Sequence, residues 1–139
     1  MNFSVDHAEG DQPITILRLE GDLDASNFET VIEEGTRLHA EGTSNLLIDL
    51  RAVPFMGSSG LVALHSLALL LAGGAGDDLS AGWEAQHAIA RAVEGGMQNH
   101  LKVLLSPDPE SSLARVMDRT GMNRFIEVCT DEATAIAAF

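Results

Sequence analysis

A short apolar segment that leads into an apolar helix constrains the fold of this chain more than any other feature. Residues 46–50 read Leu-Leu-Ile-Asp-Leu, a run that is too short for a helix and is typical of a buried strand in a parallel sheet. After a loop, leucines recur at helical spacing, at positions Leu61, Leu64, Leu67 and Leu71. A buried strand followed by a buried helix predicts an α/β fold, with helices packed against a sheet.

Two strands are expected ahead of this unit. Phe3, Val5 and His7 alternate with polar residues, and residues 14–19 form a second, more apolar run. The turn cluster at residues 10–13 separates the two runs. This pattern predicts an antiparallel hairpin.

A helix is expected between the hairpin and residues 46–50. Ser26 and Glu29 have the spacing of a capping box, in which each side chain satisfies a free amide of the first turn. Gly42 is the expected end of this helix. The residues expected to be buried are Phe28, Val31, Ile32 and Leu38. A strand, a helix and a second strand in this order imply a right-handed crossover between parallel strands.

The C-terminal part repeats the alternation of strands and helices. Residues 101–105 form an apolar strand, and Asp108 with Pro109 indicates a helix start with proline at the first helical position. Gly121 is the expected end of that helix. Its buried side is expected to contain Leu113, Val116 and Met117.

A last strand and a final helix are expected at the end of the sequence. Residues 125–128 read as the strand, and Thr130 or Asp131 is the expected cap of the helix. The helical residues expected to face inward are Ala133, Ile136 and Ala137. The whole pattern predicts a mixed sheet of about five strands with about four helices packed against it.

The acidic composition excludes some classes of partner. The formal net charge of the 139 residues is −13, and the chain lacks the Lys/Arg stripe that counterion release on nucleic acid requires. No apolar run reaches the roughly 20 residues of a membrane-spanning helix, and residues 1–6 show no secretion signal. With Cys129 as the single cysteine, we expect a cytoplasmic protein without disulfides, nucleic-acid binding or direct membrane insertion.

Three segments, taken in order, resemble the STAS family of anti-sigma factor antagonists. The first is Gly21-Asp22-Leu23-Asp24, ahead of the first helix. The second is the strand at 47–50 followed by Val-Pro-Phe-Met-Gly-Ser-Ser-Gly-Leu at 53–61, and the third is 122–126 followed by 130–133. The resemblance implies the STAS fold and a single STAS domain over residues 1–139. A segment at about 73–100, with a helix expected at 83–93, is inserted between the second helix and the fourth strand.

The resemblance also implies regulation by partner switching. In this family the serine after the strand-loop segment, here Ser58, is phosphorylated by a serine kinase that is also an anti-sigma factor. The dephosphorylated form binds that kinase and frees the sigma factor, and a Ser/Thr phosphatase resets the switch. The partner-binding residues implied for this chain are Asp24, Gly57, Ser58, Ser59 and Gly60.

One position departs from the family pattern, because Gly57 stands where the family has aspartate. A hydroxyl of Ser58 or Ser59 can replace that carboxylate as a helix cap, but not in recognition by a kinase. Two alternatives therefore stay open. One is a STAS accessory subunit of a membrane transporter of the lipid or anion type, and the other is a non-phosphorylated signalling scaffold. Whether the chain forms a homodimer is also open.

No catalytic, cofactor or metal site is expected. A nucleophile elbow around Ser59 would need glycine at position 61, which is leucine. The five histidines, at positions 7, 39, 65, 87 and 100, show no close ligand spacing. His65 is expected to be a surface or core histidine, and Asp49 is expected to satisfy loop amides.

Overall fold

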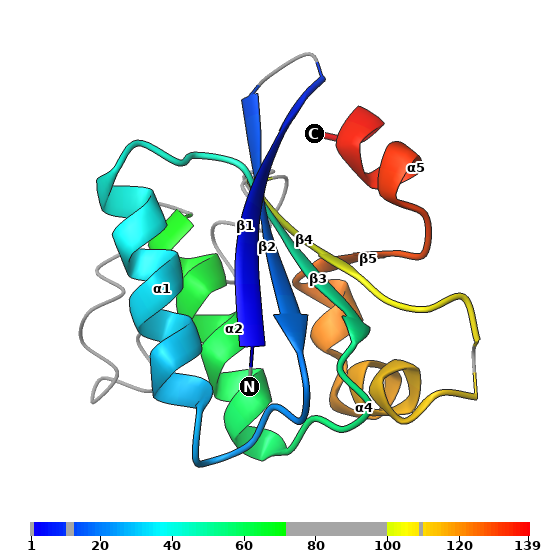
Figure 1. Ribbon diagram of the computed structural model, residues 1–139. Helices are drawn as coiled ribbons and strands as arrows, with labels where there is room; N and C mark the ends of the chain where they lie inside the picture. Colours follow the sequence, from blue (N-terminus) through cyan, green and yellow to red (C-terminus); the bar gives the residue numbers. More distant parts are fainter. Residues whose placement is uncertain (1, 11–12, 72–99, 109) are drawn as a thin grey trace.

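A five-stranded sheet organises the part of the chain that the computed structural model describes, which is residues 2–10, 13–71, 100–108 and 110–139 (Figure 1). The strand order is β1-β2-β3-β4-β5, with β1 antiparallel to β2 and the other neighbours parallel. The strands are β1 (Asn2–Glu9), β2 (Pro13–Glu20), β3 (Leu46–Ala52), β4 (Leu101–Leu104) and β5 (Glu127–Cys129). The predicted mixed sheet and its N-terminal hairpin are therefore confirmed.

Four helices pack against this sheet in the described residues, as predicted. They are α1 (Phe28–Ala40), α2 (Ser58–Leu71), α4 (Ser112–Thr120) and α5 (Glu132–Ala137), and a 3-10 turn, η2 (Met122–Arg124), follows α4. The glycines expected to end α1 and α4 are in the left-handed region, with φ of 112° at Gly42 and 72° at Gly121. The expected helix at 83–93 lies outside the described residues, as does nearly all of the inserted segment.

The two faces of the sheet are covered differently, because side chains alternate along each strand. On one face Leu17, Ile48 and Val103 pack with α1, α2 and α4 in the main core. On the other face Ile16 and Leu47 pack with α5 in a smaller cluster. Figure 1 shows α5 on the opposite side of the strands from α1 and α2. The crossovers therefore place three helices on one face and leave the other to a single short helix.

The predicted starts of one helix and one strand in the C-terminal part were wrong. Helix α4 begins at Ser112 instead of Asp108, because the Ser111 hydroxyl caps it by accepting the N–H of Ala114 (3.2 Å). The last strand begins at Glu127 instead of Phe125, because the N–H groups of Phe125 and Ile126 both bond to the carbonyl oxygen of Met122, the first residue of η2. Both segments contain side-chain or 3-10 hydrogen bonds that compete with the expected helix and strand.

The inward side of α5 was predicted correctly only at Ile136, which packs against the smaller core cluster. Asp131 caps the helix as predicted and accepts the N–H of Thr134 (2.9 Å). However, Ala135 is the buried residue and Ile136 is half-buried, whereas Ala133 and Ala137 are exposed. A helix of six residues is too short for its apolar spacing to define one face clearly.

Candidate functional site

The loops that follow β2 and β3 lie side by side. Leu23 and Met56 form an isolated parallel bridge. Leu23 donates its N–H to the carbonyl oxygen of Phe55 (2.9 Å), and its own carbonyl oxygen accepts the N–H of Gly57 (2.9 Å). These bonds bring Asp24 next to the start of α2, so two of the motifs found in the sequence meet at one edge of the sheet.

Ser58 is the first residue of α2, and its side chain is exposed. Its hydroxyl makes no hydrogen bond with any other described residue. Ser59 is half-buried. Because the first turn of a helix has free backbone amides, and because the helix dipole is positive at this end, negative charge on Ser58 is favoured.

The two glycines that flank the serines have different environments. A β-carbon on Gly60 would lie 2.3 Å from Cγ of Met56 and 3.0 Å from Cγ of Leu23. Gly60 is thus buried where the two loops pack most closely. A β-carbon on Gly57 would meet only the Phe55 ring, at 3.7 Å, and the φ angle of Gly57 is not positive. A side chain can therefore begin at position 57 without a clash, so neither the backbone nor close packing requires glycine there.

Asp24 organises the turn that leads into α1. Its carboxylate accepts hydrogen bonds from the Oγ and N–H of Ser26, and these bonds hold the pKa of Asp24 below its usual value. Asn27, which immediately precedes α1, accepts the N–H of Asp24 (2.9 Å). The predicted capping box of Ser26 and Glu29 is wrong, since Ser26 bonds to Asp24 instead.

The start of α4 also holds the loop at 53–57 in place. The Ser112 hydroxyl, at the start of α4, donates to the carbonyl oxygen of Pro54 (2.9 Å). The loop at 53–57 is thus held by the 21–24 loop and by α4. Neither the Ser112 contact nor the loop-to-loop bridge has a signal in the sequence, because both join residues far apart in the chain.

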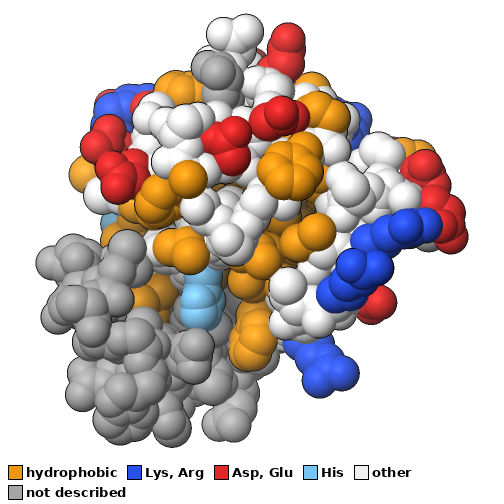
Figure 2. Space-filling model, turned by 90° about the horizontal axis from the view of Figure 1, so that it is seen from below, with side chains coloured by type: hydrophobic (Ala, Val, Ile, Leu, Met, Phe, Trp, Pro, Cys, Tyr) orange, Lys and Arg blue, Asp and Glu red, His pale blue; other side chains and the backbone are white. Residues whose placement is uncertain are grey.

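Two exposed apolar side chains lie beside Ser58 and were missed by the sequence analysis. The side chain of Phe55 is 52% exposed and that of Val62 is 44% exposed. Figure 2 views the molecule from the end that contains the start of α2, and hydrophobic side chains gather in the middle of this face with acidic side chains beside them. The sequence indicated this exposed surface only by an aromatic residue, Phe55, in the loop at 53–57.

A charged cluster occupies the sheet face that carries α5. Arg18 binds Asp49 (2.8 Å), and both Arg18 and Arg51 bind Glu132 at the start of α5. Asp49 also accepts the N–H of Arg51 (3.0 Å), which belongs to β3 itself, so the prediction that Asp49 satisfies loop amides was wrong. Burial alone would raise the pKa of Asp49, but its bonds with Arg51 and Arg18 outweigh burial and lower it. These ion pairs fasten α5 to the sheet.

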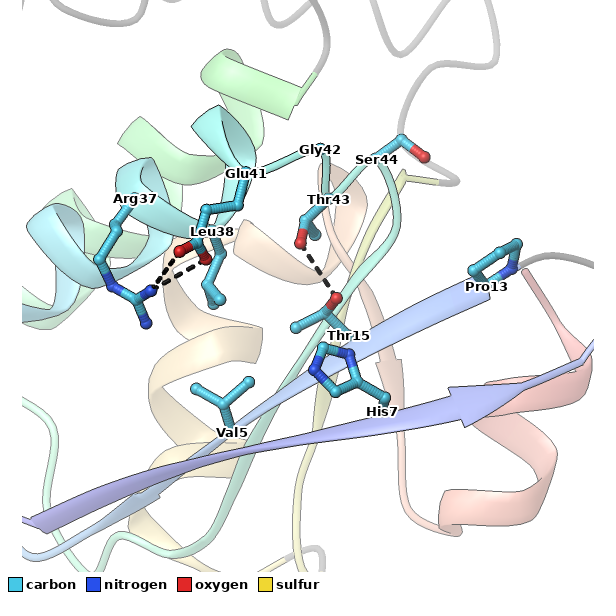
Figure 3. Close-up of a pocket in the computed structure, with 10 residues that line it drawn as sticks. All are labelled: Val5, His7, Pro13, Thr15, Arg37, Leu38, Glu41, Gly42, Thr43 and Ser44. Atoms are coloured by element: carbon cyan, nitrogen blue, oxygen red, sulfur yellow. Dashed lines mark hydrogen bonds and ion pairs between the residues drawn. The ribbon is translucent and has the colours of Figure 1, made fainter.

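A separate hollow of about 500 Å³ lies between the hairpin and the C-terminal end of α1 (Figure 3). Thr15 and Thr43 share a hydrogen bond across it (3.0 Å), and Arg37 binds Glu41 (2.9 Å). These polar side chains bond to one another at the end of α1 that is remote from the 21–24 loop. The hollow is therefore distinct from the surface around Ser58.

Neither metal ligation nor membrane spanning has a structural basis in the described part of the chain. No group of three or more His, Cys, Asp or Glu there is arranged to hold a metal ion. His65 is half-buried on α2, and burial lowers the pKa of its imidazole. None of the helices in the described ranges is long and apolar enough to cross a membrane.

Comparison with known proteins identifies the fold. A family model of the STAS domain matches residues 7–72. An anti-sigma factor antagonist from Mycobacterium paratuberculosis is 19% identical, with a TM-score of 0.62 over 99% of this chain and 93% of that chain. No curated protein shows a significant sequence match.

Two structures of SpoIIAA have the same fold. The anti-sigma factor antagonist SpoIIAA in its unphosphorylated form is 14% identical, with a TM-score of 0.50 over 96% of this chain and 92% of that chain. The Bacillus cell fate determinant SpoIIAA in the phosphorylated form is 18% identical, with a TM-score of 0.51 over 96% of both chains. The STAS fold implied by the sequence is therefore confirmed.

Proposed function

We propose that this chain, whose residues 7–72 match the STAS family model, is an anti-sigma factor antagonist that works by partner switching. It binds an anti-sigma factor that is also a serine kinase, phosphorylation of Ser58 prevents this binding, and a Ser/Thr phosphatase restores it. The chain is then a regulatory binding protein and not an enzyme. The exposed and unbonded hydroxyl of Ser58 is the observation that carries the proposal.

The position of Ser58 supports control of an interface without a change of fold. A phosphate adds a charge of about −1.5 to −2 near neutral pH, and the helix start tolerates that charge. At an interface the same charge causes repulsion and must be desolvated, which can cost several kcal/mol. Because about 1.4 kcal/mol changes affinity tenfold, one phosphate is enough for a switch.

One structural relative supports phosphorylation of a domain of this fold. The Bacillus SpoIIAA structure is of a phosphorylated protein, so a domain of this fold carries a phosphoryl group. In this chain the loops of Asp24 and Gly57 are bonded to each other next to Ser58. Asp24, Gly57, Ser58 and Ser59 therefore form one continuous candidate surface, with Gly60 beneath it.

Co-purification from the native host tests this function. We expect the wild-type chain to recover an anti-sigma factor of the serine-kinase type, and mass spectrometry to find phosphate on the Ser58 peptide. Ser58→Asp should weaken binding at least about tenfold with little change in thermal stability. Ser44→Asp is the matched control for added charge, since Ser44 is an exposed serine at the hollow remote from Ser58.

Gly57 favours a second function. A β-carbon fits at this position, so close packing does not account for the glycine. A STAS accessory subunit of a membrane transporter, or a signalling scaffold without kinase control, would have no need of a carboxylate there. Recovery of transporter subunits alone, with Ser58 unmodified, would favour the accessory subunit and exclude the partner switch.

A further inference from the structure

We propose that Phe55 and Val62 form the apolar centre of the surface that binds the anti-sigma factor, and that Asp22 and Asp24 form its acidic margin. This inference rests on the function proposed above and names the residues of the same surface that supply the contact. The partner face it fits has an apolar pocket bordered on one side by Lys or Arg side chains.

The two apolar residues flank Ser58. The Phe55 ring lies 3.7 Å from the place where a β-carbon on Gly57 would be, and Gly57 directly precedes Ser58. Val62 is four residues after Ser58 in α2, so the two side chains lie on the same face of the helix. Phe55 and Val62 are not among the buried members of the two core clusters, and their side chains are 52% and 44% exposed. Their exposed surface is therefore available for a partner.

The backbone that presents Phe55 is fixed before any partner binds. The carbonyl oxygen of Phe55 accepts the N–H of Leu23 (2.9 Å), and that of Pro54 accepts the Ser112 hydroxyl (2.9 Å). A side chain on a fixed loop loses less conformational entropy on binding. Large aromatic residues in such positions commonly supply much of the binding free energy.

The position of the acidic margin follows from the bridge between Leu23 and Met56. Asp22 and Asp24 flank Leu23, whose backbone is bonded to Phe55 and Gly57. Both carboxylates thus lie beside the apolar centre, on a chain whose net charge is −13. Figure 2 shows acidic side chains next to the central hydrophobic ones on this face. A basic border on the partner would complement this margin.

The same arrangement explains why a phosphate on Ser58 would be effective. A charge placed between Phe55 and Val62 would enter the part of the contact that excludes water. Desolvation of that charge would cost more there than at a polar margin. The effect of Ser58 on binding should therefore depend on Phe55.

Calorimetric titration of the co-purified anti-sigma factor tests this dependence. Phe55→Ala should weaken binding at least about tenfold, which corresponds to about 1.4 kcal/mol. Phe3→Ala is the matched control, because Phe3 is an exposed phenylalanine on β1 (39%) and should change affinity less than about threefold. In the Phe55→Ala background, Ser58→Asp should have a smaller effect than in the wild type, which is the signature of coupling.

Each contrary result has its own meaning. If the wild type binds the anti-sigma factor and Phe55→Ala binds equally well, the apolar centre is wrong but the proposed function stands. If the wild type binds no anti-sigma factor, the proposed function fails and this inference fails with it. A wild-type dimer that Phe55→Ala dissociates, seen by sedimentation, would show that a second copy covers the surface and would also overturn the inference.

Discussion

Gly60 lies directly against Met56, because a β-carbon on Gly60 would be 2.3 Å from the Cγ of Met56. The contact is part of the packing between the 53–57 loop and α2, and Leu23 closes it from the other side at 3.0 Å. The segment from Gly57 to Gly60 therefore combines two kinds of residue. Gly60 is required for packing, whereas Gly57 and Ser58 are open to solvent or half-buried and leave the packing unaffected.

Gly60→Ala should therefore destabilise the protein, and Gly57→Ala should not. The added methyl at position 60 has to displace Met56 and Leu23, which are both buried, at a cost of about 1–3 kcal/mol. At position 57 the methyl meets open space and an ordinary contact with Phe55, so a change within about 0.5 kcal/mol is expected. Urea denaturation of both variants measures the difference, and equal midpoints would contradict the packing described here.

Gly57→Asp should fold normally and become a better kinase substrate. A β-carbon at position 57 makes only ordinary contact with the Phe55 ring, and the aspartate would supply the carboxylate that the resemblance to the STAS family leads us to expect before Ser58. We expect the rate of Ser58 phosphorylation by the co-purified kinase to increase about tenfold. Such an increase corresponds to an activation free energy that is lower by about 1.4 kcal/mol. Gly57→Asn separates charge from shape, and an unchanged rate in Gly57→Asp would mean that this position is not read by the kinase.

The sequence alone predicted correctly the helices and strands whose hydrophobic pattern is long and regular. The strand at 46–50, helix α2 and the hairpin were predicted correctly because burial on one or both faces leaves a clear period in the residues. Where a side chain forms a local hydrogen bond, the prediction failed. Ser26 bonds to Asp24 instead of capping α1, and Ser111 caps α4 in place of the expected start at Asp108. Residue spacing alone does not show which of several possible caps a helix uses.

The candidate site was only partly predictable for a different reason. The position of Ser58 at the start of a helix follows from the order of strand, loop and helix, which is local. The bridge of Leu23 to Met56 and the bond of Ser112 to Pro54 join distant segments. Their existence depends on the crossover geometry, so Phe55 could not be recognised as a fixed and exposed side chain before the structure was known.

The stability of the fold should fall at acid pH through Asp49. Bonds with Arg51 and Arg18 outweigh burial and lower the pKa of Asp49 in the folded state. A lowered folded pKa adds stability above the unfolded pKa of about 4, and this contribution is lost as pH falls through the folded value. We expect the urea midpoint to drop below about pH 4 in the wild type.

Asp49→Asn isolates this contribution from that of the other carboxylates. The variant should be less stable at pH 7 and should lose less stability between pH 5 and pH 3 than the wild type does. Arg18 keeps Asp6 and Glu132 as partners in the variant, so the guanidinium is not left unpaired. Identical pH slopes for the two proteins would show that Asp49 does not contribute.

The buried Lys102 should make Glu127 more important for stability than an ordinary surface carboxylate. The Lys102 side chain is 0% exposed, and its ammonium binds Glu127 and lies 5.0 Å from the centre of the Phe139 ring. Glu127→Gln removes the only carboxylate bonded to this ammonium among the described residues. The remaining charge is buried with weaker partners, and we expect a loss of about 1–3 kcal/mol.

Two control variants test whether the burial of the Lys102 ammonium causes this loss of stability. Lys102→Met removes the charge and keeps the volume, so it should cost less than about 1 kcal/mol even though it deletes the same ion pair. Glu41→Gln removes the partner of the exposed Arg37 and should cost less than about 0.5 kcal/mol. Urea denaturation at neutral pH ranks the three variants. If Glu127→Gln is as stable as Glu41→Gln, the Lys102 ammonium is solvated in the folded state and its burial does not govern the energetics of this pair.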